Sequence, residues 1–189
     1  EKPDTEIHIL GYLVDRKLEW LKERLKTIQE YRIERIHKMV EKLSAEGIII
    51  TADDVFKVAG KGSVGRLHLA RAMLNSGGVK TFRDAFDKYI GFGKPCYVPN
   101  IRFTPKDAIS MVLDAGGVPV LAHPGRMLVD TDLLPLLVSW GLGGIETYYP
   151  SHGTAEITNL IGLAGQYNLV ITGGSDFHGD RNGASLGDG

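Results

Sequence analysis

Apolar residues in the first half of the chain recur at helical spacing. Within residues 17–43 they fall three, four or seven positions apart, which predicts one long amphipathic helix that ends at Gly47. Shorter helices are predicted over residues 52–59, 66–74 and 82–90. Thr51 and Thr81 are suitable N-caps for two of these helices. Because this stretch contains no convincing strand, residues 16–100 are expected to form an all-helical subdomain.

The second half of the chain alternates between helices and short apolar strands. Thr104-Pro105 begins a helix that Gly116-Gly117 closes. The elements predicted after it are strand 118–122, helix 133–140, strand 144–149, helix 155–167 and strand 169–172. Near the start of the chain, residues 7–14 are apolar on both alternating faces, as expected of a strand that is covered on both sides. Strands that alternate with helices imply parallel β/α units, in an open sheet or a barrel.

Composition narrows the function classes. The chain has 22 basic and 23 acidic residues, so its net charge of -1 provides no overall field for binding a polyanion, and any preference for phosphate must be local. The single cysteine, Cys96, excludes an intrachain disulfide and fits a reducing compartment. No apolar run reaches the roughly 18 residues of a membrane span, and the start has no signal-peptide character. We therefore expect a cytoplasmic protein without membrane contacts.

Four residues are candidate metal ligands. His123 directly follows one predicted strand, and Asp176 and His178 follow another. The carboxyl ends of parallel strands gather functional groups at one edge of a sheet, and the Asp-x-His spacing turns both side chains to the same side. His8 is the one polar interruption of the first apolar run. Any one of these histidines could be an ordinary polar residue, but imidazoles combined with a carboxylate indicate a site for Zn²⁺, Mn²⁺ or Fe²⁺.

These segments resemble motifs of the PHP (polymerase and histidinol phosphatase) family. Residues 121–125 (Leu-Ala-His-Pro-Gly) and 174–179 (Gly-Ser-Asp-Phe-His-Gly) are similar to its late motifs, and residues 6–12 (Glu-Ile-His-Ile-Leu-Gly-Tyr) to a middle one. The helical stretch is similar to the insertion found in the branch of small nucleotide phosphoesterases and 5'-end-trimming ribonucleases. Its matching parts are residues 65–70 (Gly-Arg-Leu-His-Leu-Ala) and 93–99 (Gly-Lys-Pro-Cys-Tyr-Val-Pro).

The resemblance implies a fold and a domain division. Residues 1–15 and 101–189 would form part of a distorted (β/α)7-type barrel, and residues 16–100 would form the helical insertion. In the family, an opening His-x-His pair, a further Asp and His, and a bridging Glu precede the position of His8. We therefore expect the chain to be a fragment that lacks this N-terminal part of the barrel, and expect its last four residues to stop before a closing element.

The resemblance also implies a cluster of up to three divalent metal ions, most often Mn²⁺, with Fe or Zn as alternatives. Carried over by motif, His8 and His123 would share one metal. Asp176 and His178 would each hold another.

Basic residues of the helical stretch are candidates for binding a substrate phosphate. Arg35 and Lys38 follow Arg32 at three-residue steps along one face of the long helix. Arg66 and His68 begin a helix after a glycine-rich loop, where the helix N-terminus favours anions. If the insertion covers the metal site, these side chains would hold a phosphate that the metals do not bind. The alternative is a solvated basic stripe.

The expected reaction is hydrolysis of a phosphate monoester or terminal phosphodiester on a nucleotide-like substrate, by metal-activated water. His178 or His152 could protonate the leaving oxygen, although a structural role fits His152 equally well. Glu146, within a strand, could fix the barrel interior or a histidine that supports the metal ligands without binding the metal itself. Ser175 and Cys96 have no adjacent base in the sequence, so no covalent nucleophile is expected.

Three other functions stay open. A 5'-3' exoribonuclease would bind short RNA or DNA oligonucleotides in a basic groove, in place of a nucleoside bisphosphate. A non-catalytic metal-binding or regulatory domain fits the missing opening ligands. An amidohydrolase-type barrel would hydrolyse C–N bonds and release no phosphate. The sequence leaves the oligomeric state open.

Overall fold

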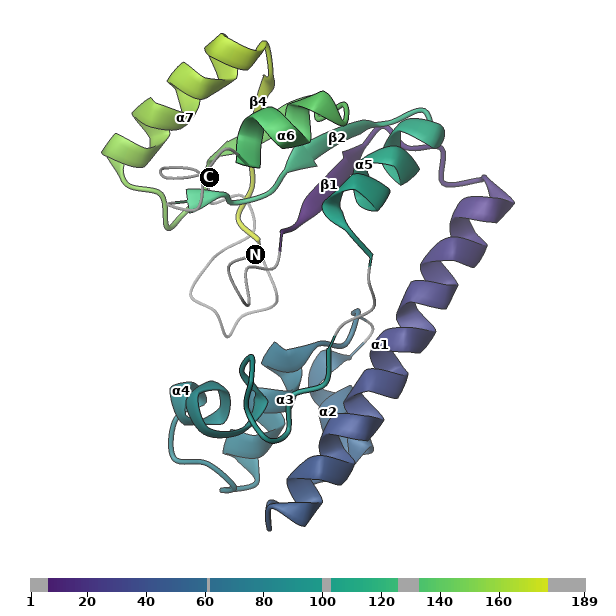
Figure 1. Cartoon of the computed structure of the whole chain (residues 1–189), viewed down its shortest axis with the longest axis vertical. Helices are drawn as coiled ribbons and strands as arrows, with labels where there is room; N and C mark the ends of the chain where they lie inside the picture. The colour runs from purple at the N-terminus through teal and green to yellow at the C-terminus, as the bar shows by residue number, and fades with distance from the viewer. Residues whose placement is uncertain (1–6, 61, 100–102, 126–132, 177–189) are drawn as a thin grey trace. The chain divides into compact units, whose positions relative to one another are not determined.

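The computed structural model describes residues 7–60, 62–99, 103–125 and 133–176, and the chain falls into two compact units (Figure 1). The described part of the helical unit lies within Lys22–Arg102. The described part of the sheet unit lies within Glu6–Leu21 and Phe103–Gly189. The predicted domains, 1–15 with 101–189 and 16–100, stay a prediction about the organisation of the whole protein.

The helical unit packs its helices around one apolar core. Its elements are α1 (Glu19–Ala45, of which the residues from Lys22 belong to this unit), α2 (Ala52–Ala59), α3 (Arg66–Asn75), α4 (Phe82–Asp84) and the π-helical η1 (Ala85–Ile90). Thr51 and Thr81 are N-caps as predicted. The Thr51 hydroxyl accepts a hydrogen bond from the Asp54 amide at 3.2 Å, and the Asp54 carboxylate accepts one from the Thr51 amide at 3.0 Å. The core includes Ile36, Met39, Leu43, Leu69, Met73 and Ile90.

The sheet unit is an α/β unit with helices packed against a four-stranded sheet. Its elements are β1 (Ile9–Tyr12), α5 (Pro105–Asp114), β2 (Val118–Leu121), α6 (Leu133–Ser139), β3 (Gly144–Tyr148), α7 (Thr154–Tyr167) and β4 (Val170–Gly173). The strand order is β1-β2-β3-β4, and β2, β3 and β4 are parallel, as the alternation of strands and helices predicts. The core includes Ile109, Leu121, Leu137, Ile145 and Leu160. The mixed α/β class is confirmed, whereas closure into a (β/α)7 barrel stays a prediction.

Strand β1 differs from its prediction. It covers Ile9–Tyr12 and not residues 7–14, and after the half-buried Ile9 its residues are exposed, so the prediction that it is covered on both sides is wrong. It also pairs antiparallel with β2, with Ile9 opposite Leu121 and Tyr12 opposite Val118. An apolar run does not encode whether its strand lies at an edge of a sheet or in which direction it pairs. None of the described helices is both long and apolar enough to cross a bilayer.

Candidate metal centre

The start of β1 and the end of β2 reach the same edge of the sheet, because these two strands are antiparallel. The Ala122 amide donates to the carbonyl oxygen of His8 at 3.0 Å, which extends the pairing one step beyond the strands. At this edge Nδ1 of His8 lies 3.0 Å from Nε2 of His123. The two rings are nearly perpendicular, at 84°, with centroids 4.9 Å apart. Two of the predicted ligands thus come together.

The spacing of these two nitrogens suits two ligands of one divalent ion. With metal–nitrogen distances of about 2.0–2.1 Å and bond angles between a right angle and a tetrahedral one, two bound nitrogens lie about 2.8–3.4 Å apart. Imidazole nitrogen is also the donor type that Zn, Fe and Mn accept. Within the described ranges, no group of three or more His, Cys, Asp or Glu side chains is close enough to hold an ion. The fit to a metal therefore rests on the His8–His123 pair.

A buried carboxylate holds the backbone of His123. Glu146 on β3 is 4% exposed, and its Oε2 accepts a hydrogen bond from the His123 amide at 2.7 Å. His123 has a φ of +28°, which L residues rarely adopt, and this hydrogen bond helps to stabilise it. The other carboxylate oxygen lies so close to Gly174 that a Cβ there would collide with it. Glu146 therefore fixes the backbone of His123, a predicted ligand, through its amide.

Tyr149 connects Asp176 to the histidine pair. Its ring centroid lies 5.4 Å from that of His123, and its hydroxyl shares a hydrogen bond with Asp176. Burial raises the pKa of the Tyr149 phenol, and the carboxylates of Asp176 and Glu146 raise it further. The phenol therefore stays protonated and donates a hydrogen bond to the Asp176 carboxylate. Tyr149 is not among the residues predicted from the sequence, although it lies directly after β3, at the carboxyl end of a strand, where functional residues gather.

Both ring nitrogens of His152 are hydrogen-bonded. Nδ1 lies 2.9 Å from the carbonyl oxygen of Thr147, which can only accept, so Nδ1 carries a proton. Nε2 accepts a hydrogen bond from the Gly125 amide at 3.1 Å, which requires it to be unprotonated. His152 thus holds the turn after His123, where Gly125 has a φ of +50°. This arrangement favours the structural one of its two expected roles. His178, the remaining predicted ligand, lies outside the described residues.

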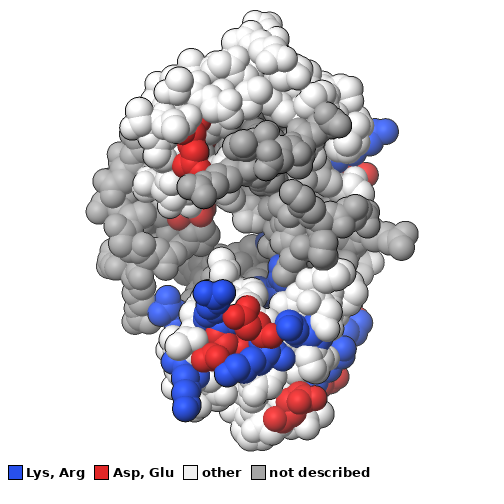
Figure 2. Space-filling model, turned by 60° about the vertical axis from the view of Figure 1, so that its left-hand side comes forward, with Lys and Arg blue, Asp and Glu red and all other residues white. Residues whose placement is uncertain are grey.

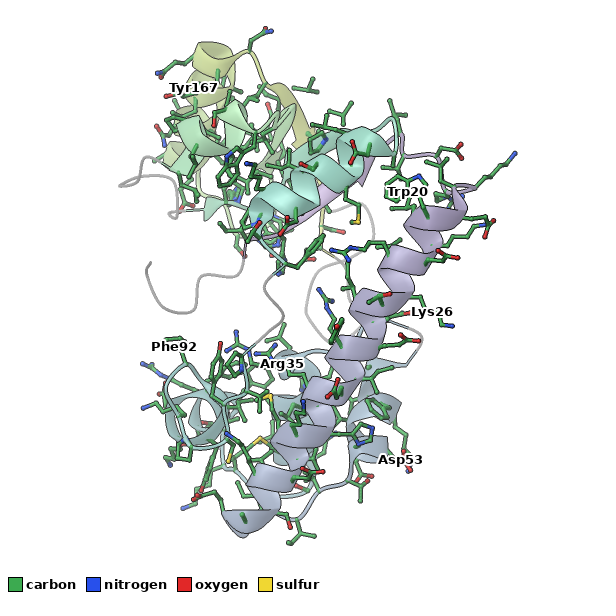
Figure 3. All side chains as sticks on the ribbon, turned by 45° about the vertical axis from the view of Figure 1, so that its right-hand side comes forward. Trp20, Lys26, Arg35, Asp53, Phe92 and Tyr167 are labelled. Carbon is green, nitrogen blue, oxygen red and sulfur yellow. The ribbon has the colours of Figure 1, made fainter. Side chains whose placement is uncertain are left out.

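Two of the predicted substrate-binding residues meet at one aromatic ring in the helical unit. The Cζ atoms of Arg35 and Arg66 each lie 5.7 Å from the ring centroid of Tyr97. Arg35 is only 9% exposed, and its Nε donates to the carbonyl oxygen of Val98 at 2.7 Å. Figure 3 shows Arg35 on the side of α1 that faces the other helices of this unit. The alternative of a solvated basic stripe therefore does not include Arg35.

The other two predicted residues make different contacts. Lys38 is exposed and pairs with Glu34 at 2.6 Å, as an ordinary surface ion pair does. Nδ1 of His68 accepts a hydrogen bond from the Gly65 amide at 3.1 Å, at the beginning of α3. In the face seen in Figure 2, basic and acidic side chains are interspersed over the helical unit. The described residues on this face of the helical unit therefore form no large patch of a single charge sign.

Comparisons with known proteins place the chain among phosphoesterases, although no family model matches it. It is 34% identical over 182 residues to the 3',5'-nucleoside bisphosphate phosphatase of Chromobacterium violaceum, covering 94% of this chain and 64% of that protein. It is 33% identical over 177 residues to the 5'-3' exoribonuclease Rnm of Escherichia coli, covering 92% and 60%. The chain thus spans less than two thirds of the length of these curated relatives.

Two solved structures are similar to the fold of the chain. One is a protein of Bifidobacterium adolescentis classified as a metal-dependent phosphoesterase, with a TM-score of 0.80 and 30% identity over 98% of this chain and 67% of that one. The chain belongs to a PHP-like family of phosphoesterases. The other structure is described as an amidohydrolase of Chromobacterium violaceum with bound sulfate and no metal. Its TM-score is 0.77, with 34% identity over 91% of this chain and 62% of that one.

Proposed function

We propose that the whole protein is a metal-dependent phosphoesterase that hydrolyses a phosphate monoester or terminal phosphodiester of a nucleotide-like substrate. The observation that carries the proposal is the 3.0 Å pairing of His8 and His123 in a chain of this family. One relative is named for nucleoside bisphosphates and another for RNA, and both substrates contain phosphate esters of nucleosides. The sulfate in the amidohydrolase structure, an analogue of phosphate, is consistent with this substrate class.

His8 and His123 are proposed to hold one divalent ion, and Asp176 and His178 further ions in a cluster of up to three. Mn²⁺ is the first candidate, with Fe or Zn as alternatives. Such ions would lower the pKa of a water molecule and offset negative charge on the phosphoryl oxygens. The distorted (β/α)7 barrel and a cytoplasmic location remain parts of the same proposal.

The chain's own residues would position these ligands. Glu146 fixes the backbone of His123, Tyr149 donates to Asp176, and His152 holds the turn after His123. His178 is the proposed donor of the proton to the leaving oxygen, through the ring nitrogen that does not bind a metal ion, since both ring nitrogens of His152 are already hydrogen-bonded.

Arg35 and Arg66, which meet at Tyr97, are proposed to bind a substrate phosphate through their guanidinium groups. Lys38 is proposed to add positive charge, and His68 to fix the start of α3 next to Arg66. The substrate would be a nucleoside bisphosphate or a short oligonucleotide. A 5'-3' exoribonuclease is the second candidate, because Rnm is a relative. The net charge of -1 and the mixed charge of the helical unit in Figure 2 favour the smaller substrate.

The test uses the full-length protein with added Mn²⁺. Phosphate release from adenosine 3',5'-bisphosphate and mononucleotide release from a short 5'-phosphorylated RNA are measured together with the content of bound metal. We expect His123→Ala and Asp176→Ala each to lower bound metal, and the rate to fall by about 100-fold or more. His37→Ala is the matched control, because His37 packs against Phe56 on the helical unit with ring centroids 5.5 Å apart.

Unchanged metal content and unchanged rates in both variants would overturn the proposal. Faster turnover of the RNA than of the bisphosphate would select the exoribonuclease. Bound metal without turnover of any phosphate ester would indicate a binding or regulatory domain. Hydrolysis of C–N bonds without phosphate release would indicate an amidohydrolase.

A further inference from the structure

The loop of residues 91–99 follows η1 and is tied to the body of the helical unit. Cys96 is fully buried, and its amide donates to the carbonyl oxygen of Tyr89 at 2.9 Å. The Gly91 amide donates to the carbonyl oxygen of Phe86 at 3.0 Å. The loop, which contains one of the family-like segments recognised in the sequence, therefore has fixed anchor points along its length.

Two cations of α1 hold the other side of this loop. Nζ of Lys42 donates to the carbonyl oxygen of Tyr97 at 3.1 Å, and Nε of Arg35 donates to that of Val98 at 2.7 Å. The second hydrogen bond also fixes the plane of the Arg35 guanidinium. Since side chains on an anchored backbone lose little entropy when a ligand binds, such a loop is a suitable platform for recognition.

The loop of residues 91–99 also carries an exposed aromatic side chain. Phe92 is 53% exposed, and its ring makes an edge contact with Tyr97, with centroids 5.5 Å apart and an angle of 63° between the rings. Figure 3 shows Phe92 at the margin of the helical unit. A single exposed aromatic residue is common on protein surfaces. What distinguishes Phe92 is that the ring it touches also contacts the guanidinium groups of Arg35 and Arg66.

We propose that Phe92, Tyr97, Arg35 and Arg66 form a recognition site for a nucleoside phosphate in the helical unit. The base stacks on Phe92, the two guanidinium groups bind a phosphate, and Tyr97 holds both arginines and Phe92 in place. Every base has a π-face, so the site accepts different bases and distinguishes nucleotides from phosphate esters that lack a base. This inference rests on the proposed function only for the substrate class.

The test measures equilibrium binding by calorimetry with the full-length, metal-loaded protein. The probes are a slowly hydrolysed phosphorothioate analogue of adenosine 3',5'-bisphosphate and the matching ribose bisphosphate analogue without a base. We expect Phe92→Ala to raise the Kd of the nucleotide by about 5- to 100-fold and to leave that of the base-free probe unchanged. Phe92→Trp keeps a stacking surface and should restore tight binding. Ile49→Ala, which truncates a 75% exposed apolar residue of the same unit, is the matched control.

The proposal is overturned if Phe92→Ala changes the Kd of the nucleotide by less than about twofold, or weakens both probes equally. It is also overturned if the wild-type protein binds the two probes equally well. Because binding is measured apart from turnover, a protein that prefers the nucleotide but hydrolyses nothing would overturn the proposed function alone. An active phosphoesterase that does not respond to Phe92→Ala would overturn the stacking site alone.

Discussion

Nδ1 of His8 lies 3.0 Å from Nε2 of His123 because β1 runs antiparallel to β2. Ile9 faces Leu121, so His8 continues the pairing opposite Ala122, directly before His123. A parallel β1 would have placed the start of its strand at the opposite edge of the sheet. The direction of one short edge strand therefore decides whether these two imidazoles can share an ion.

If His8 and His123 hold the same ion, their substitutions should not be additive. We expect His8→Ala and His123→Ala each to lower metal affinity by about 10- to 100-fold, and the double variant to be little worse than either single one. Metal affinity is measured by competition with a chelator in the full-length protein. Effects that multiply in the double variant would mean that the two histidines bind different ions.

Local sequence signals predicted most of the elements. Capping residues and glycines determine helix ends within a few neighbouring residues, so α2 coincides with its predicted range, and Thr104 begins α5 as expected. The carboxyl-end rule for parallel strands pointed to His123 and Asp176. The direction and exposure of β1 depend on tertiary pairing, which a run of apolar residues does not encode.

The three-residue spacing of Arg32, Arg35 and Lys38 predicted that they lie along one basic face of the long helix, but the structure gives Arg35 and Lys38 different surroundings. Residues three positions apart on a helix differ by about 60° in direction, so Arg35 and Lys38 do not point the same way. Arg35 turns toward the core and is 9% exposed, whereas Lys38 remains at the surface. Which of two neighbouring side chains on a helix is buried depends on what packs against the helix. Here the loop of residues 91–99 packs against Arg35, which donates a hydrogen bond to the carbonyl oxygen of Val98.

Gly174 is predicted to be essential because a side chain at this position would collide with the Glu146 carboxylate. In Gly174→Ala the new Cβ would displace the Glu146 carboxylate and weaken its hydrogen bond to the His123 amide. We expect a loss of about 1–3 kcal/mol in unfolding free energy and a 10- to 100-fold fall in metal affinity. Thermal unfolding and metal titration check both effects.

The control is Gly165→Ala on α7, where a Cβ would have no heavy atom within 4 Å. Alanine favours a helix over glycine by about 0.5–1 kcal/mol, so this variant should be more stable and bind metal normally. If Gly174→Ala behaved in the same way, the contact between Gly174 and Glu146 would have no role in the site.

Tyr149→Phe should distinguish the contribution of the Tyr149 hydroxyl from that of its ring. The ring contacts with His123 and His152 remain, while the hydrogen bond to Asp176 is lost. We expect metal affinity to fall by about 10-fold, with only about 1 kcal/mol lost in stability. Tyr148→Phe is the control, because Tyr148 is 45% exposed. Equal effects of the two variants on metal affinity would contradict an orienting role for the Tyr149 hydroxyl.

Asp84 should make the stability of the helical unit depend on pH. Its pKa lies below the ordinary value of 3.8, first because Lys88 donates a hydrogen bond to its carboxylate and then because Thr81 does. Folding therefore favours the charged carboxylate. The resulting stability is fully present above the ordinary pKa and is lost as the pH falls through the lowered pKa of the folded protein.

We therefore expect Asp84→Asn to lower the melting temperature at about pH 7 and to have a smaller effect at about pH 2, where the contribution of the charged carboxylate is reduced. The Asp84 side chain is 22% exposed and its partner Lys88 is 61% exposed, so solvent screens the pair and the change at neutral pH should be a few degrees at most. Lys88→Met removes the largest cause of the shift and should shrink the pH-dependent difference while leaving the Thr81 cap intact. An equal loss at both pH values would show that the neutral capping hydrogen bond, and not the charge of Asp84, stabilises this helix start.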